Sequence, residues 1–182
     1  MNKTRFLLAF FLFAFPFTSE EAIWAKPQRK VVRRTVLDYF RLLPMDAGIF
    51  EAEKRESLIG KHFPHIIDLK NDYMQVTGDG AQPSFQIAVF RYRGRDLVAV
   101  SSVIGGPDYF FDLRRYENGK WKKVTAAVSP LVSSEDSDLH FVLPWHGTTI
   151  QVFRRNGTLA AQLLWENGNF SAKKIQFNAL RH

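Results

Sequence analysis

Residues 148–177, TTIQVFRRNGTLAAQLLWENGNFSAKKIQF, contain the pattern that decides the fold class. Two Asn-Gly dipeptides, at 156–157 and 167–168, separate three segments in which strand-forming residues predominate. Asn-Gly supplies the two positive φ angles of a type I′ turn, which joins neighbouring antiparallel strands. A third Asn-Gly, at 118–119, lies between the segments YFFDLRRY and WKKVT. These repeated turns predict an antiparallel meander.

The same period of two extends backward from this meander to about residue 66. Segments rich in β-branched and aromatic residues alternate with Gly, Asn and Asp, which is typical of short strands joined by turns. The ten strands that we predict are 66–70, 73–78, 85–92, 97–103, 109–116, 121–125, 139–143, 148–153, 159–165 and 170–177. No crossover helices separate these segments, which argues against a parallel α/β fold.

Two short helices are expected before the strands. The first ends at Pro44, and its apolar face consists of residues at helical offsets of three and four. These residues are Val32, Val36, Tyr39, Phe40 and Leu43. The second helix is predicted from about 47 to 59, with Asp46 as its N-cap and Gly60 as its stop.

The expected fold is therefore mainly β with N-terminal helices, an α+β arrangement. The antiparallel meander either closes into a barrel or folds into a two-sheet sandwich, and the helices cover one opening or face. The alternative is a cone-shaped α+β fold of the nuclear-transport-factor-2 type, in which helices precede a curved sheet. That fold usually has fewer strands than this sequence predicts.

The first 25 residues have the organisation of a secretory signal peptide. Lys3 and Arg5 precede the apolar run FLLAFFLFAFPF at 6–17, and Ala25 is suited to the cleavage site. The run is shorter than the roughly 20 residues that span a bilayer, so we expect no transmembrane span in the mature chain. We predict a single exported domain at 26–182, soluble in the periplasm or secreted. Because the chain has no cysteine, we expect neither disulfides nor a lipoprotein anchor.

The chain is strongly basic, with a formal net charge of +7. For an exported protein this charge favours envelope polyanions, such as lipid head groups, over nucleic acid. The densest basic segment is KPQRKVVRR at 26–34, which contains no acidic residue. It is interpreted as a flexible N-terminal arm, or alternatively as an arm that binds an anionic partner. Its basic residues are Lys26, Arg29, Lys30, Arg33 and Arg34.

No motif in the sequence identifies a reaction, so we predict no catalytic residue, metal or cofactor and favour a role other than catalysis. The chain has no cysteine nucleophile, GxSxG elbow or SxxK pair. Its histidines do not have the spacing of a metal site, and loop or strand-end positions explain them better. They include His62, His65, His140 and His146.

Arginines and aromatic residues near the predicted strands suggest a binding surface. Arg91, Arg93 and Arg95 alternate, as residues on one sheet face do, and two further arginines follow at 114–115. Guanidinium groups bind carboxylates and phosphates, and exposed aromatic rings stack on sugars or protein partners. The predicted binding residues are Arg91, Arg93, Tyr109, Arg114, Arg115, Trp121 and Trp145. The alternative is an ordinary polar outer face with aromatic residues packed at its rim.

The sequence thus favours a non-enzymatic envelope protein that binds a protein or an anionic envelope component through a basic and aromatic sheet face. The alternative is a domain that binds a small molecule or lipid in a cavity between helices and sheet, with or without hydrolase activity. No group of residues marks the chain as a member of a known family.

Overall fold

The computed structural model describes six stretches of the chain, all within the unit that begins at Arg33. They are residues 33–48, 52–60, 63–79, 83–103, 109–128 and 138–174. The signal predicted at 1–25 and the predicted arm residues Lys26, Arg29 and Lys30 lie outside the described residues.

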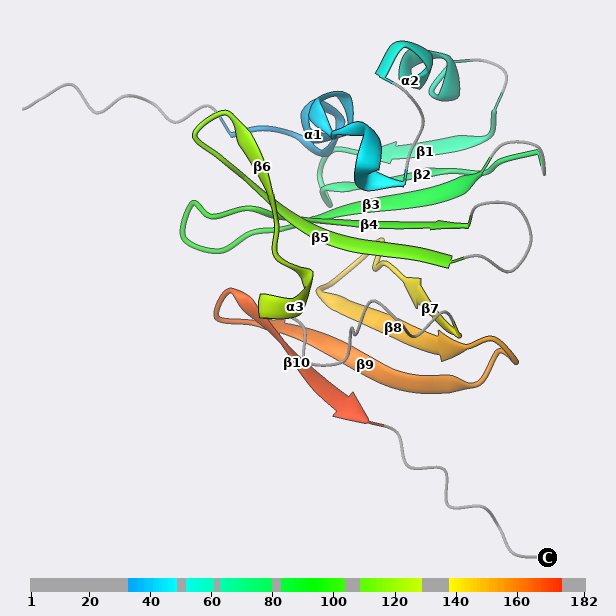
Figure 1. Ribbon diagram of the computed structural model, residues 1–182, viewed down its shortest axis with the longest axis vertical. Helices are drawn as coiled ribbons and strands as arrows, with labels where there is room; N and C mark the ends of the chain where they lie inside the picture. The colour runs from blue at the N-terminus through cyan, green and yellow to red at the C-terminus, as the bar shows by residue number, and fades with distance from the viewer. Residues whose placement is uncertain are drawn as a thin grey trace, which may run out of the picture. The chain divides into compact units, whose positions relative to one another are not determined.

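Ten strands in the described part of the chain form two antiparallel sheets (Figure 1), which confirms the prediction of a mainly β protein with preceding helices. The larger sheet follows chain order and contains β1 (His65–Asp68), β2 (Tyr73–Val76), β3 (Ser84–Phe90), β4 (Leu97–Val103), β5 (Tyr109–Glu117) and β6 (Lys120–Lys123). The smaller sheet has the order β10-β9-β8-β7 and contains β7 (Leu139–Val142), β8 (Thr149–Arg154), β9 (Leu159–Glu166) and β10 (Asn169–Lys174). Neither sheet closes into a barrel over the described residues.

Four short helical segments accompany the sheets: α1 (Val36–Leu42), η1 (Met45–Ala47), α2 (Ala52–Leu58) and α3 (Thr125–Val128). Thr35 and Asp38 form a capping box that fixes the start of α1. Asp46 was predicted to cap the second helix, and that prediction is wrong. Asp46 lies inside η1, and Gly48 then adopts a left-handed conformation with φ of 68°, so the chain turns before α2 begins.

The larger sheet is packed on both faces. One face meets α1 and α2 through a core that includes Phe40, Phe85 and Val100, and the other face meets the smaller sheet through a core that includes Leu97 and Leu163. Each of these side chains is buried. Figure 1 shows the same order of layers, with α1 and α2 on one side of the larger sheet and β7–β10 on the other. Both core faces follow the alternation that the sequence predicts for strands.

Arg55 of α2 stabilises the end of α1 from inside the core. Its side chain is buried and donates hydrogen bonds to backbone carbonyls in the last turn of α1 and in the two residues after it. Those carbonyls belong to Phe40, Arg41, Leu43 and Pro44. The last carbonyls of a helix have no partner within the helix, so a cation at this position satisfies them.

The three Asn-Gly turns differ in conformation. At 118–119 and 167–168 both residues have positive φ, as predicted for type I′ turns. At 156–157 only the glycine has positive φ, and the Asn156 side chain accepts hydrogen bonds from the backbone N–H and hydroxyl of Thr158. The connection at 156–157 is therefore not a type I′ turn, although it joins the two strands that the sequence predicts on either side of it.

The helices in the described part of the chain are far too short to cross a membrane. The longest of them, α1 and α2, have seven residues each, against the roughly 20 that a bilayer requires.

Candidate functional site

The turns between strands lie at two opposite ends of the described structure. Because the strands are antiparallel and follow chain order, the β1–β2, β3–β4 and β5–β6 turns lie at one end of the larger sheet. Contacts from Trp145 to Asp68 and from Arg115 to Gly168 bring the β7–β8 and β9–β10 turns to that same end. We call this region the hairpin end. It comprises residues 33–35, 68–72, 91–96, 115–122, 143–148 and 165–169.

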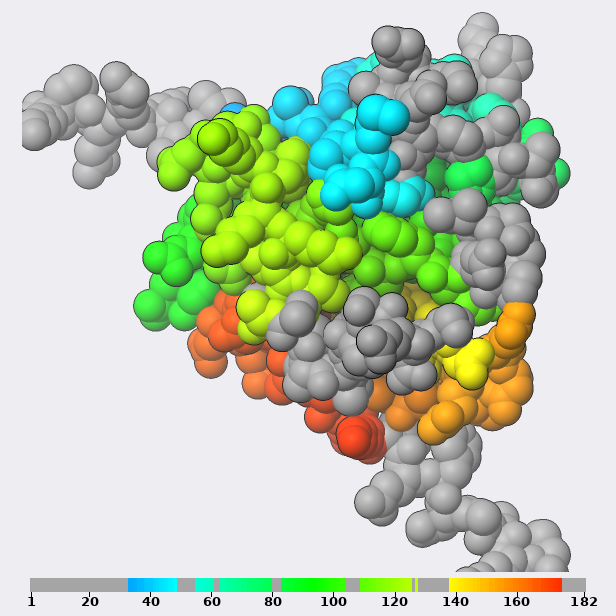
Figure 2. Space-filling model, in the orientation of Figure 1, coloured from blue at the N-terminus to red at the C-terminus, as the bar shows by residue number. Residues whose placement is uncertain are grey.

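The hairpin end carries more cations than anions. Its segments contain nine Lys or Arg residues and five Asp or Glu residues. The cations are Arg33, Arg34, Lys70, Arg91, Arg93, Arg95, Arg115, Lys120 and Lys122, and the anions are Asp68, Asp72, Asp96, Glu117 and Glu166. In Figure 2 the β3–β4, β5–β6 and β9–β10 turns lie beside one another and form a continuous surface. A basic surface of this kind attracts anionic partners.

Arg91 is the most constrained of the predicted binding residues. Its guanidinium pairs with Asp96 and with Asp72, at 2.5 Å from one oxygen of Asp72, and donates to the carbonyl of Arg34 at 2.7 Å. Burial opposes the charge, but the hydrogen bond to Asp72 and the charges of Asp96 and Asp72 outweigh it and raise the pKa of Arg91. Arg91 therefore organises the site and is not available to a partner.

Aromatic rings link α1 to the β5–β6 hairpin. Trp121 packs edge-on against Tyr39 and Tyr116, with ring centroids 5.8 and 5.1 Å apart, and donates to the carbonyl of Leu42 at 2.6 Å. The guanidinium of Arg34 lies 4.8 Å from the centroid of the Tyr116 ring. This arrangement fixes the aromatic surface predicted at Trp121, and it places a cation on it.

The hydroxyl of Tyr39 donates to Asp96 at 2.8 Å. Burial, followed by this hydrogen bond, raises the pKa of Tyr39 to about 12. The hydroxyl therefore stays protonated and acts as a fixed donor, which excludes it as a base near neutral pH.

Arg115 and Lys122 form a cationic pair without a carboxylate partner among the described residues. They face each other directly across β5 and β6. The only hydrogen bond of the Arg115 side chain within this part of the chain runs to the carbonyl of Gly168 at 3.1 Å, and its buried Nε has no partner there. Like charges placed directly opposite one another destabilise a sheet. This pair is thus the most unusual electrostatic feature of the hairpin end.

Arg93 and Arg95 lie in the β3–β4 turn and are exposed. They were predicted to alternate with Arg91 on a sheet face, but β3 ends at Phe90, so all three follow the strand. Arg93 has a positive φ of 47°, and its guanidinium lies 5.1 Å from the centroid of the Tyr92 ring. Both side chains remain accessible to an anion.

Trp145 also reaches the hairpin end, but its faces are occupied. Its ring stacks near-parallel to Tyr73 and to His146, with centroids 6.0 and 5.3 Å apart. Its indole N–H donates to Asp68 at 2.9 Å. Hydrogen bonds from Asn71 and then from Trp145 lower the pKa of Asp68 to about 2. Trp145 is 44% exposed, and it presents a rigid edge rather than a free stacking platform.

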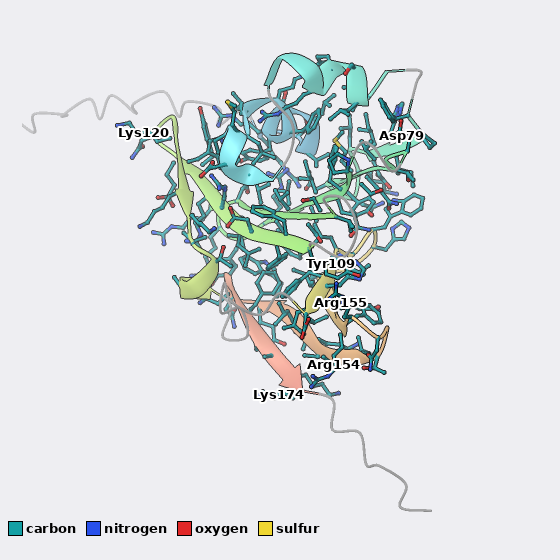
Figure 3. The ribbon with its side chains drawn as sticks, turned by 45° about the vertical axis from the view of Figure 1, so that its right-hand side comes forward. Asp79, Tyr109, Lys120, Arg154, Arg155 and Lys174 are labelled. Atoms are coloured by element: carbon teal, nitrogen blue, oxygen red, sulfur yellow. The ribbon has the colours of Figure 1, made fainter. Side chains whose placement is uncertain are left out.

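Two predicted binding residues lie elsewhere. Arg114 is 4% exposed and pairs with the fully buried Asp112 at 2.6 Å and with Asp46 at 2.9 Å. Its role is therefore to tie η1 to the larger sheet. Tyr109 starts β5 at the opposite end and stacks on His140 at 4.8 Å. Figure 3 shows this separation, with Lys120 on one side and Tyr109 on the other.

A cavity of about 200 Å³ opens between the two sheets at the hairpin end. Its lining includes Lys70, Asp72, Arg91, Phe90 and Trp165. Known ligand pockets are usually larger, at roughly 300–1,000 Å³. The cavity is better suited to one inserted side chain or head group than to a cofactor.

The sequence did not single out several residues of the hairpin end, namely Tyr116, Lys70, Lys120 and Lys122, or Tyr39 of α1, which packs against it. A usable signal was present, because alternate turns of a meander lie at the same end. Within the described residues, no group of His, Asp and Glu is arranged to hold a metal ion. His62, one of the histidines weighed as a metal ligand, lies outside them.

No protein-family model, curated protein or solved structure matches the chain.

Proposed function

We propose that the chain is an exported, non-enzymatic binding protein whose hairpin end docks on an anionic component of the cell envelope. The observation that carries this proposal is the Arg115–Lys122 pair. Two cations held opposite each other without a described carboxylate partner form a site that an anion would stabilise. A phosphate group would supply the missing charge.

The surroundings of the pair support docking over a wider surface. Arg93 and Arg95 are exposed in the neighbouring turn. Trp121, which lies on the opposite face of β6 from Lys122, adds an ordered aromatic ring on the helix-facing side of the hairpin end. Arginine and tryptophan side chains are enriched among the residues that dominate binding energy. The cavity beside Lys70 offers a socket for part of the partner.

The N-terminal basic segment leads into the same surface. Arg33, the first described residue, pairs with Asp72 at 2.7 Å, and Arg34 lies on Tyr116. The predicted signal peptide supports an envelope location, where anionic lipid head groups are abundant.

Binding to vesicles tests the proposal. The triple variant Arg93→Glu, Arg95→Glu, Lys122→Glu is compared with a control of equal net charge, Arg154→Glu, Arg155→Glu, Lys174→Glu. Each cation near an anionic surface contributes about 1 kcal/mol, so the triple variant is expected to bind phosphatidylglycerol vesicles at least about a hundredfold more weakly. The control variant should bind within about threefold of the wild type.

Equal losses in both variants would show that net charge alone drives binding, and the proposed site would be wrong. If the wild type ignored anionic vesicles but co-purified reproducibly with one envelope protein through the hairpin end, the partner would be that protein and not an anionic lipid surface.

The alternative of small-molecule or lipid binding has one observation in its favour. Cavities of about 200 and 140 Å³ lie between the two sheets, near their opposite ends. The helix-facing side of the larger sheet is instead filled by buried residues such as Phe40 and Phe85, whose rings stack at 5.7 Å. We also favour a two-sheet sandwich over the cone-shaped fold, because a second sheet packs against the first.

A further inference from the structure

A row of polar side chains crosses the core between the two sheets. Gln75, Gln86 and Ser101 are direct neighbours on β2, β3 and β4, in register with one another. They lie on the face of the larger sheet that packs against β7–β10, beside buried apolar residues such as Ala88 and Ala99. Ser101 is buried and the two glutamines are half-buried. The buried part of a polar side chain is unfavourable unless it is hydrogen-bonded.

The protein supplies partners for the oxygen atoms of this row. The hydroxyl of Tyr73 donates to Oε1 of Gln75 at 2.7 Å, and the N–H of Leu143 donates to Oε1 of Gln86 at 2.9 Å. The hydroxyl of Ser101 donates to the carbonyl of Phe141 at 2.5 Å. These bonds fix the orientation of both amides, because Nε2 cannot accept a hydrogen bond.

The two amide nitrogens then remain as donors. No described residue hydrogen-bonds to either Nε2, and neither nitrogen is fully buried, since Gln75 and Gln86 are half-buried. Both residues line a cavity of about 140 Å³. The hydroxyl of Ser84 also lines it, where it accepts from the N–H of Gly78 and keeps its own proton to donate. We call this space the glutamine cavity.

His140 of β7 completes the lining. Its ring stacks on Tyr109 at 4.8 Å and lies 6.2 Å from the ring of Phe153. Burial lowers the pKa of His140, so the imidazole is neutral at neutral pH. No charged side chain is therefore found in the described lining at that pH.

We propose that the glutamine cavity binds a small uncharged molecule through a carbonyl oxygen, which the amide groups of Gln75 and Gln86 hold. Several donors fixed around one space match an acceptor, and the absence of a described counter-charge disfavours burial of an ion. Cavities of about this volume hold a molecule of roughly six non-hydrogen atoms. The site is separate from the hairpin end, so it stands whether or not the proposed function holds.

Acetamide is the probe for this site, and acetate is the charged comparison. We expect acetamide to shift the NMR signals of the Gln75 and Gln86 side-chain amides saturably at millimolar concentration. Acetate should bind at least about tenfold more weakly at neutral pH, because its charge has no counter-ion there. Wild-type shifts that do not saturate, or a crystal soak that shows ordered water only, would overturn the proposal.

Two substitutions at Gln75 keep the test decisive. Gln75→Met removes the side-chain amide altogether. Gln75→Glu removes the amide donors but keeps an oxygen that accepts from Tyr73. If only one of the two variants folds, that variant is enough for the test. Each should weaken acetamide binding about tenfold. The matched control is Gln162→Met, since Gln162 belongs to a cross-strand pair with Gln151 on the smaller sheet. Equal affinity in the Gln75 variants and the wild type, or equal loss in the control, would refute the assignment.

Discussion

The substitution Lys122→Glu should stabilise the fold and weaken anion binding at the same time. Lys122 lies directly opposite Arg115, so the change converts a pair of like charges into a pair of opposite charges. Replacing an ordinary surface lysine is not expected to raise stability and lower affinity together. Replacing a lysine that binds an anionic partner but repels a neighbouring arginine is expected to do both.

The magnitude follows from the register. Side chains directly opposite each other on antiparallel strands are about 5 Å apart at Cβ. Two unit charges as close as that in a water-like dielectric would interact by about 0.8 kcal/mol. This is an upper value, because both charges lie at the ends of long side chains, and reversing the sign of one charge at most doubles it. Ordering two long side chains offsets part of this gain. We expect the free energy of unfolding to rise by about 1 kcal/mol at low salt.

Urea unfolding at low and high salt measures this effect, with unchanged m-value as a check on two-state behaviour. The gain should fall by more than half at high salt, because screening shortens the range of the interaction. Lys174→Glu serves as the control, since Lys174 faces Ala161 and gains no pair. A destabilised Lys122→Glu protein, or an equal gain in the control, would refute the argument that Arg115 and Lys122 repel each other.

Four further changes test the described structure. Arg55→Met should lower the free energy of unfolding by about 2–4 kcal/mol in urea titrations, because it leaves buried carbonyls of α1 without a donor. Arg114→Met should lower it by about 3–5 kcal/mol by stranding buried Asp112, and adding Asp112→Leu should restore more than half of that loss. Gly168→Ala should lower Tm by several degrees, because the position has φ of 86° and a Cβ would lie 2.7 Å from a neighbouring tyrosine ring. Burial lowers the pKa of His140, so the unfolded chain takes up the proton first and stability should decline as pH falls below about 6.5, whereas His140→Gln should flatten that part of the profile.

The strands were predictable because local chemistry determines them. Asn-Gly sets the turns at 118–119 and 167–168, and alternation sets the buried faces between turns. The division into two sheets was not predictable in the same way. It depends on which faces meet in the core, and an unbroken meander has the same local pattern as a divided one.

The arginines show where sequence reasoning about the site fails. Arg114 and Arg115 are neighbours in the sequence, but successive strand residues point to opposite faces. Arg114 therefore meets buried Asp112 on the helix-facing side, while Arg115 reaches the hairpin end. Tertiary packing determines which of the two arginines lies next to a buried carboxylate. Arg91 was predicted as a ligand-binding residue, but Asp72 and Asp96 occupy its donors.

Tyr73 connects the two candidate sites through different parts of one side chain. Its ring stacks on Trp145 at the hairpin end, and its hydroxyl donates to Gln75 in the glutamine cavity. Burial raises the pKa of Tyr73 to about 12, so the hydroxyl remains a donor and Oε1 of Gln75 remains its acceptor. The orientation of the Gln75 amide, and with it the donor that faces the cavity, therefore depends on a ring held in place at the other site.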